Sequence, residues 1–131
     1  MTCDLAVAAP NASFIQAFSK IGLIPDSGGT YTLPRLAGLN LASALMMTGD
    51  KLSAEDARAF GLIYKVFDDP ELMSETLTLA TRLSEMPTKA LGLTKRLLNQ
   101  SFSNNLEQQL KAEGELQVES AGSYDYNEGV K

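Results

Sequence analysis

The segment Leu5–Ala9 contains five apolar residues in succession and is followed by Pro10 and Asn11, which indicate a turn. A short run of this kind is typical of a strand that is buried on both faces. Such a strand needs a neighbour on each side, and the nearby sequence supplies one further strand-like segment, Ser13–Phe18. We therefore expect these strands to belong to a larger sheet, part of which lies outside this chain.

Patterns typical of helices make up most of the chain after Gly29. Ser53 and Asp56 have the spacing of a capping box, and Asp69 before Pro70 is expected to cap the next helix. The sequence predicts helices at residues 30–37, 39–48, 53–61 and 106–121, others beginning near residues 70, 87 and 124, and a further strand at 62–67. In coarse terms, we expect two or three short strands followed by a mainly helical region.

The composition excludes several kinds of protein. The 131 residues include no histidine and one cysteine, so a Ser-His-Asp triad, an HExxH zinc site and an internal disulfide are ruled out. A net charge of −5 argues against a nucleic-acid-binding surface. No apolar stretch reaches the ~20 residues that span a bilayer, and residues 1–10 lack the basic region of a signal peptide. We therefore expect a cytoplasmic protein, with no membrane partner and no metal site.

Asp26 is the strongest candidate for chemistry. It is the one acidic residue in an apolar stretch that ends at Gly28 and Gly29. Partial removal from water would make such a carboxylate a stronger base, and the two glycines would let a substrate approach the backbone closely. Without histidine, acid–base catalysis must use a carboxylate, a lysine or a tyrosine. The alternative is that Asp26 only caps the helix that follows it.

Three segments resemble, in order, the motifs of the crotonase (enoyl-CoA hydratase/isomerase) superfamily: Gly22–Thr30, Thr48–Ala57 and Asp125–Val130. The resemblance covers essentially the whole chain and implies an α/β crotonase (ClpP/crotonase-like) fold. Members of the family are longer, and the resemblance implies that this chain is the C-terminal half. Residues 1–67 would then belong to the spiral core, and residues 68–131 to a helical trimerisation-type region, truncated at its C-terminus.

The resemblance also implies an acyl-CoA thioester as substrate, with coenzyme A as part of that substrate and no separate cofactor. Asp26 stands where isomerases of the family have a catalytic aspartate, whereas Phe18 stands where hydratases have a second glutamate. This favours an isomerase, which moves a proton between carbons of the acyl chain through an enolate, over a hydratase. The resemblance implies that the backbone donors that would hold the enolate lie outside this chain, so we expect the isolated chain to be inactive.

By the same resemblance, residues near Asp26 are implied to line the acyl pocket: Leu23, Ile24, Pro25, Tyr31 and Leu33. From the residues alone, Tyr31 is more readily a helix-packing side chain than a pocket residue. The family also implies a homo-oligomer, a trimer or a hexamer. Two alternatives stay open. The chain could be a non-catalytic assembly fragment, which the poorly amphipathic stretch Leu106–Ala121 suggests, or part of an enoyl-CoA hydratase.

Overall fold

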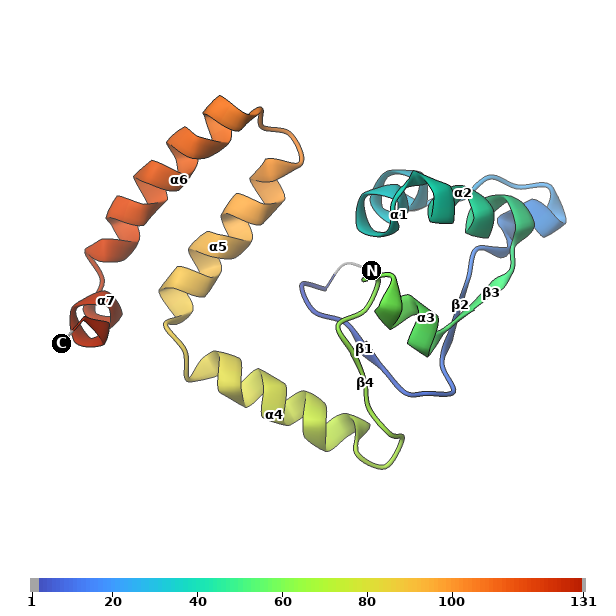
Figure 1. Ribbon diagram of the computed structural model, residues 1–131, viewed down its shortest axis with the longest axis horizontal. Coiled ribbons are helices and arrows are strands. Elements are labelled where there is room, and N and C mark those ends of the chain that lie inside the picture. Colours follow the sequence, from blue (N-terminus) through green and yellow to red (C-terminus); the bar gives the residue numbers. More distant parts are fainter. Residues whose placement is uncertain (1–2, 131) are drawn as a thin grey trace. The chain divides into compact units, whose positions relative to one another are not determined.

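The computed structural model describes residues 3–130, which form seven α-helices, one 3-10 helix and four short strands (Figure 1). The chain divides into two compact units, Met1–Thr76 and Leu77–Lys131. All of the described strands belong to the first unit. The described part of the second unit is helical, and helix α4 (Leu72–Ser84) runs from the first unit into the second.

The strands of the first unit form two sheets of two strands each (Figure 1). Strand β1 (Val7–Ala8) pairs in parallel with β4 (Lys65–Val66), and β2 (Ser13–Ile15) pairs antiparallel with β3 (Lys51–Ser53). The strands predicted near residues 5–9 and 62–67 are therefore confirmed, although each is only two residues long. The parallel pair needs the long connection between β1 and β4, and that connection contains the other two strands, the 3-10 helix and three of the α-helices.

The predicted strand Ser13–Phe18 is confirmed only as far as Ile15. The segment Ala17–Ile21 instead forms the 3-10 helix η1, which ends at Gly22 with φ of 73°. The left-handed conformation of Gly22 lets its N–H donate back into η1, which closes the turn. Strand β3 was not predicted, because its three residues are too few for their alternation to indicate a strand and it pairs with a segment far away in the sequence.

The remaining helices are close to the predicted ones: α1 (Gly29–Ala37), α2 (Leu39–Thr48), α3 (Ala54–Ala59), α5 (Thr88–Ser101), α6 (Leu106–Ala121) and α7 (Tyr124–Gly129). The cap at Ser53 is confirmed, since its Oγ accepts the N–H of Asp56 at 3.0 Å. The cap at Asp69 is wrong. Helix α4 begins at Leu72, and the carboxylate of Asp69 accepts a hydrogen bond from the side chain of Asn11 at 2.9 Å.

The two units differ in how many apolar side chains they bury. The first unit has a core of nine buried apolar side chains: Ala8, Leu33, Ala42, Leu45, Leu52, Ala54, Ala57, Leu62 and Ile63. Ala54 and Ala57 are wholly inaccessible, because small side chains let α3 pack closely against β2, β3 and β4. In the described part of the second unit, Leu116 alone is buried. None of the described helices is both long and apolar enough to cross a membrane.

Candidate active site

Asp26 lies in a tight turn between η1 and α1. The N–H of Gly29 donates to the carbonyl of Asp26 at 2.8 Å, which closes the turn. Ser27 and Gly28 both have left-handed backbone, with φ of 50° and 78°. Gly28, not Asp26, is the N-cap residue of α1, and no side chain caps this helix. The alternative role of Asp26 as a helix cap is therefore wrong, and its carboxylate is available for other contacts.

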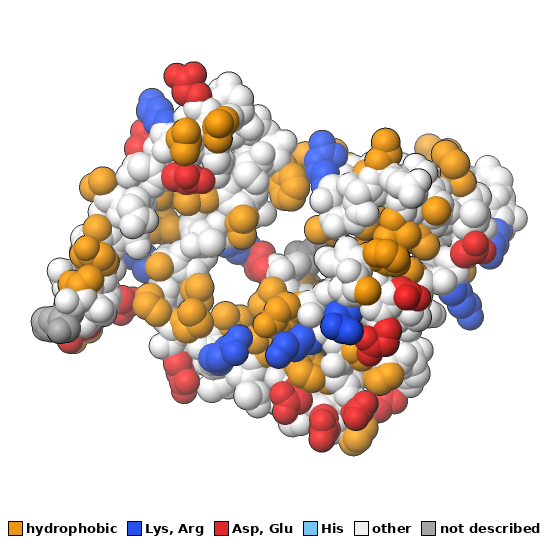
Figure 2. All heavy atoms as spheres, viewed as in Figure 1, with side chains coloured by type: hydrophobic (Ala, Val, Ile, Leu, Met, Phe, Trp, Pro, Cys, Tyr) orange, Lys and Arg blue, Asp and Glu red, His pale blue; other side chains and the backbone are white. Residues whose placement is uncertain are grey.

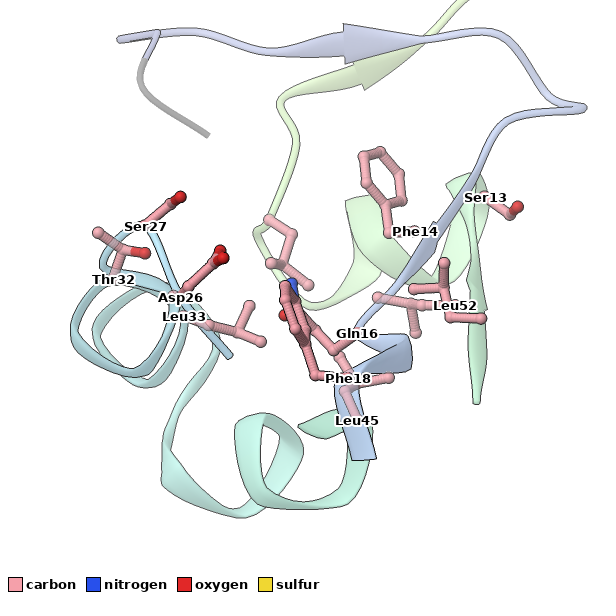
Figure 3. A pocket seen from close by; sticks show the side chains of 13 residues that line it. Ser13, Phe14, Gln16, Phe18, Asp26, Ser27, Thr32, Leu33, Leu45 and Leu52 are labelled. Atoms are coloured by element: carbon pink, nitrogen blue, oxygen red, sulfur yellow. The ribbon is translucent and has the colours of Figure 1, made fainter. Parts of the chain in front are cut away.

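The carboxylate of Asp26 lines a cavity of about 510 Å³ in the first unit (Figure 3). The apolar part of the wall comes from β2, η1, α1, α2, β3 and the segment before β4: Phe14, Ile15, Phe18, Leu33, Leu45, Leu52 and Leu62. The polar side chains on the wall are Ser13, Gln16, Asp26, Ser27 and Thr32. The arrangement is that of a ligand pocket, which combines a mainly apolar lining with a few polar groups.

Among the described residues that line the cavity, Asp26 carries the one charged side chain. Asp26 forms no ion pair or side-chain hydrogen bond with any described residue. The expected removal of Asp26 from water is not found, because the residue is exposed in this chain. What the chain shows is a free carboxylate at the edge of an apolar cavity, a placement that suits a group that exchanges a proton with a ligand.

The structure brings one of the five predicted pocket residues to the cavity with Asp26. Leu33 is buried and lines the wall. Leu23, Ile24 and Tyr31 are exposed, Pro25 is half-buried, and none of these four lines the cavity. The ring of Tyr31 is covered by the guanidinium of Arg35, 3.6 Å from the ring centroid.

Sequence reasoning missed most of the cavity wall. Phe14 and Leu52 face each other across the β2–β3 ladder, a pairing that no local pattern reveals. Gln16 had a visible signal, because it is a polar residue within the otherwise apolar run from Phe14 to Phe18. Among the residues that the structure describes, no group of three or more Asp, Glu, Cys or His side chains could hold a metal ion.

The whole chain, residues 1–131, matches the family model described as enoyl-CoA hydratase/isomerase. The chain belongs to the enoyl-CoA hydratase/isomerase family. Membership confirms the resemblance to the crotonase superfamily that the three sequence motifs indicated.

Relatives in this family include proteins named as isomerases and proteins named as hydratases. A 1,2-epoxyphenylacetyl-CoA isomerase of Escherichia coli (strain K12) is 46% identical over 127 residues, which are 97% of this chain and 48% of that protein. A probable enoyl-CoA hydratase of Rhodobacter capsulatus is 37% identical over 131 residues, 100% of this chain and 51% of that protein. The crystal structure of an enoyl-CoA hydratase from Polaromonas sp. JS666 superposes with a TM-score of 0.91 at 38% identity, over 98% of this chain and 50% of that one.

These matches bear on the fold as well as on the family. The TM-score shows that the described chain has the fold of the matching part of a crotonase-type enzyme. The chain spans about half the length of each of these relatives. Which half of the fold it corresponds to stays a prediction, as do the roles assigned to residues 1–67 and 68–131.

Proposed function

We propose that the protein is an acyl-CoA isomerase in which Asp26 carries a proton from one carbon of the acyl chain to another. The observation that supports this most directly is the cavity, where Asp26 is the one charged group among the described lining residues and Phe18 lies on the same wall. Hydration needs a second carboxylate to handle water. At the position where the resemblance puts that acid, this chain has the phenyl ring of Phe18.

The substrate class follows from the family and from one segment. The segment Phe18–Asp26 resembles the corresponding part of the isomerase that acts on ring-epoxidised phenylacetyl-CoA. The 46% identity to the Escherichia coli isomerase supports an isomerase over a hydratase, although the Rhodobacter relative is named a hydratase. The second reading therefore remains an enoyl-CoA hydratase, which would add water across the double bond of a 2-enoyl-CoA.

In the proposed reaction, the Asp26 carboxylate takes a proton from a carbon next to the double bond. The electron pair of that C–H bond moves into the conjugated system and forms the thioester enolate. Asp26 then returns the proton to a different carbon, so the double bond has moved and the carboxylate is restored. The apolar side chains of Phe14, Phe18 and Leu33 offer the acyl chain an apolar surface next to Asp26. Backbone donors implied outside this chain would stabilise the enolate oxygen.

The test replaces Asp26 in the intact protein by asparagine, which keeps the shape of the side chain and removes the base. We expect Asp26→Asn to lower the isomerisation rate by about 10²–10⁴-fold, the usual contribution of general acid–base catalysis. Binding of acyl-CoA, measured by calorimetry, should change little. The matched control is Asp68→Asn, because Asp68 is an exposed carboxylate of the first unit that does not line the cavity.

Retained isomerisation by Asp26→Asn would contradict the proposed role of this residue. Hydration of a 2-enoyl-CoA by the unaltered protein, faster than isomerisation, would favour the hydratase instead. A second candidate function, a non-catalytic assembly module, is favoured by the described part of the helical second unit, which buries Leu116 alone. Measurable turnover that depends on Asp26 would show that assembly is not the whole function.

A further inference from the structure

The carboxamide of Gln16 forms no hydrogen bond with any described residue. The residue directly precedes η1, with φ of −110°, and its side chain does not cap that helix. It is half-buried. Water still reaches this carboxamide, because among the described residues Gln100 Oε1 is the one buried side-chain polar atom without a partner. A ligand that fills the cavity would displace that water, and an unpaired carboxamide is then unfavourable unless the ligand itself supplies a partner.

Gln16 and Asp26 reach the same cavity from different elements (Figure 3). Gln16 comes from the end of β2, and Asp26 comes from the turn before α1. The Oε1 atom of Gln16 lies 3.8 Å from the point where a Cβ on Gly29 would be. Because Gly29 closes the turn that holds Asp26, the carboxamide lies against the backbone of that turn.

The other polar side chains on the wall are less suited to hold a ligand. The hydroxyl of Thr32 already donates to the carbonyl of Gly28 at 3.0 Å. Ser13 and Ser27 are exposed, so water satisfies their hydroxyls. Gln16 is the half-buried polar group of the described wall, and its carboxamide can both donate and accept.

We propose that Gln16 is a specificity-determining residue that hydrogen-bonds an oxygen atom carried on the acyl chain, such as a hydroxyl group, beyond the thioester carbonyl. This rests on the proposed acyl-CoA isomerase function. A plain hydrocarbon chain would leave the carboxamide unpaired in the filled cavity. An oxygen-bearing chain would pair with it while the rest of the chain fills the apolar part of the wall. The substrate class is therefore an oxygen-substituted acyl-CoA.

The test measures binding, so that it does not depend on turnover. Saturated acyl-CoAs of one chain length, with a hydroxyl on carbon 4, 5 or 6 or with none, have no double bond to move. Calorimetry with the intact protein should show that at least one hydroxylated thioester binds more tightly than the unsubstituted one. In Gln16→Leu, which has similar volume and no hydrogen-bonding group, this preference should fall by about tenfold, whereas affinity for the unsubstituted thioester should hold. Gln117→Leu is the control, because Gln117 is exposed on α6.

Two results would overturn the inference. One is an unaltered protein that prefers none of the hydroxylated thioesters, and the other is a Gln16→Leu variant that loses affinity for all of them equally. Either result leaves the proposed isomerase function standing if Asp26→Asn abolishes turnover. Conversely, an active Asp26→Asn variant would contradict the proposed reaction without altering the measured binding preference.

Discussion

At the scale of single residues, Ser27 holds the backbone conformation on which the position of Asp26 depends. Its φ of 50° makes it the one non-glycine residue with positive φ among the described residues. A left-handed conformation costs an L-residue roughly 1–2 kcal/mol, because Cβ approaches the neighbouring carbonyl oxygen. Serine tolerates this strain within the turn, but a side chain branched at Cβ would make it worse.

We expect Ser27→Val to lower the free energy of unfolding by about 1–2 kcal/mol, because valine is strongly disfavoured at positive φ. Ser27→Gly should be near neutral, since the relief of strain is offset by the greater entropy of glycine in the unfolded chain. Ser13→Val is the control, because Ser13 lines the same cavity from a β-strand, where valine is favoured. Urea denaturation measures all three. Equal stability of Ser27→Val and Ser27→Gly would show that the turn is not strained.

At the scale of secondary-structure elements, each unit contains helices whose N-termini are fixed by local side-chain caps. Ser53 caps α3 in the first unit. In the second unit, Asn105 and Gln108 form a complete capping box at the start of α6, with two hydrogen bonds of 2.9 Å. Caps of this kind satisfy backbone N–H groups that the helix itself cannot pair.

We expect Ser53→Ala and Asn105→Ala each to lower the free energy of unfolding by about 0.5–2 kcal/mol, through loss of the cap. The two losses should add in the double variant, because the caps share no partner and lie in different units. Ser84→Ala is the control, since the Ser84 hydroxyl only donates to the carbonyl of Thr81 near the end of α4. Thermal denaturation followed by circular dichroism gives the comparison. A double variant as stable as the unaltered protein would contradict the role of the caps.

The elements also show why some of the molecule could be predicted and some could not. Helices α2 and α3 were predicted because glycines and a serine cap near their ends act locally. Strand β3 and the cavity wall at Leu45 and Leu62 were not, because they are formed by contacts between residues distant in sequence. Asp26, which lines the cavity, could be singled out because it is a single acid before two glycines. The surroundings of Leu23 and the other predicted pocket residues depend on packing, which local pattern does not specify.

At the scale of the whole molecule, much apolar surface is left exposed, as the orange side chains in Figure 2 show. In the second unit, Leu106, Leu110 and Val118 stand four or eight residues apart along α6 and are 74%, 57% and 76% exposed. Gly114 lies four residues after Leu110 and four residues before Val118. These four positions, here called the α6 row, follow a ridge of the helix, the kind of surface that packs against another helix. A unit that buries so little has too small a core to be stable by itself.

We therefore expect the α6 row to be covered when the protein assembles, and the homo-oligomer that the family implies is the proposed form. The double variant Leu110→Glu with Val118→Glu places two carboxylates in the row, which would be costly to bury at an interface. Light scattering after size-exclusion chromatography should give a mass several times that of one chain for the intact protein and a lower mass for the variant. Gln117→Glu adds a carboxylate to the same helix outside the row and should leave the mass unchanged. A monomeric intact protein would show that the α6 row does not hold copies of the chain together. A double variant of unaltered mass would show the same, because two unpaired carboxylates could not be buried at an interface without weakening it.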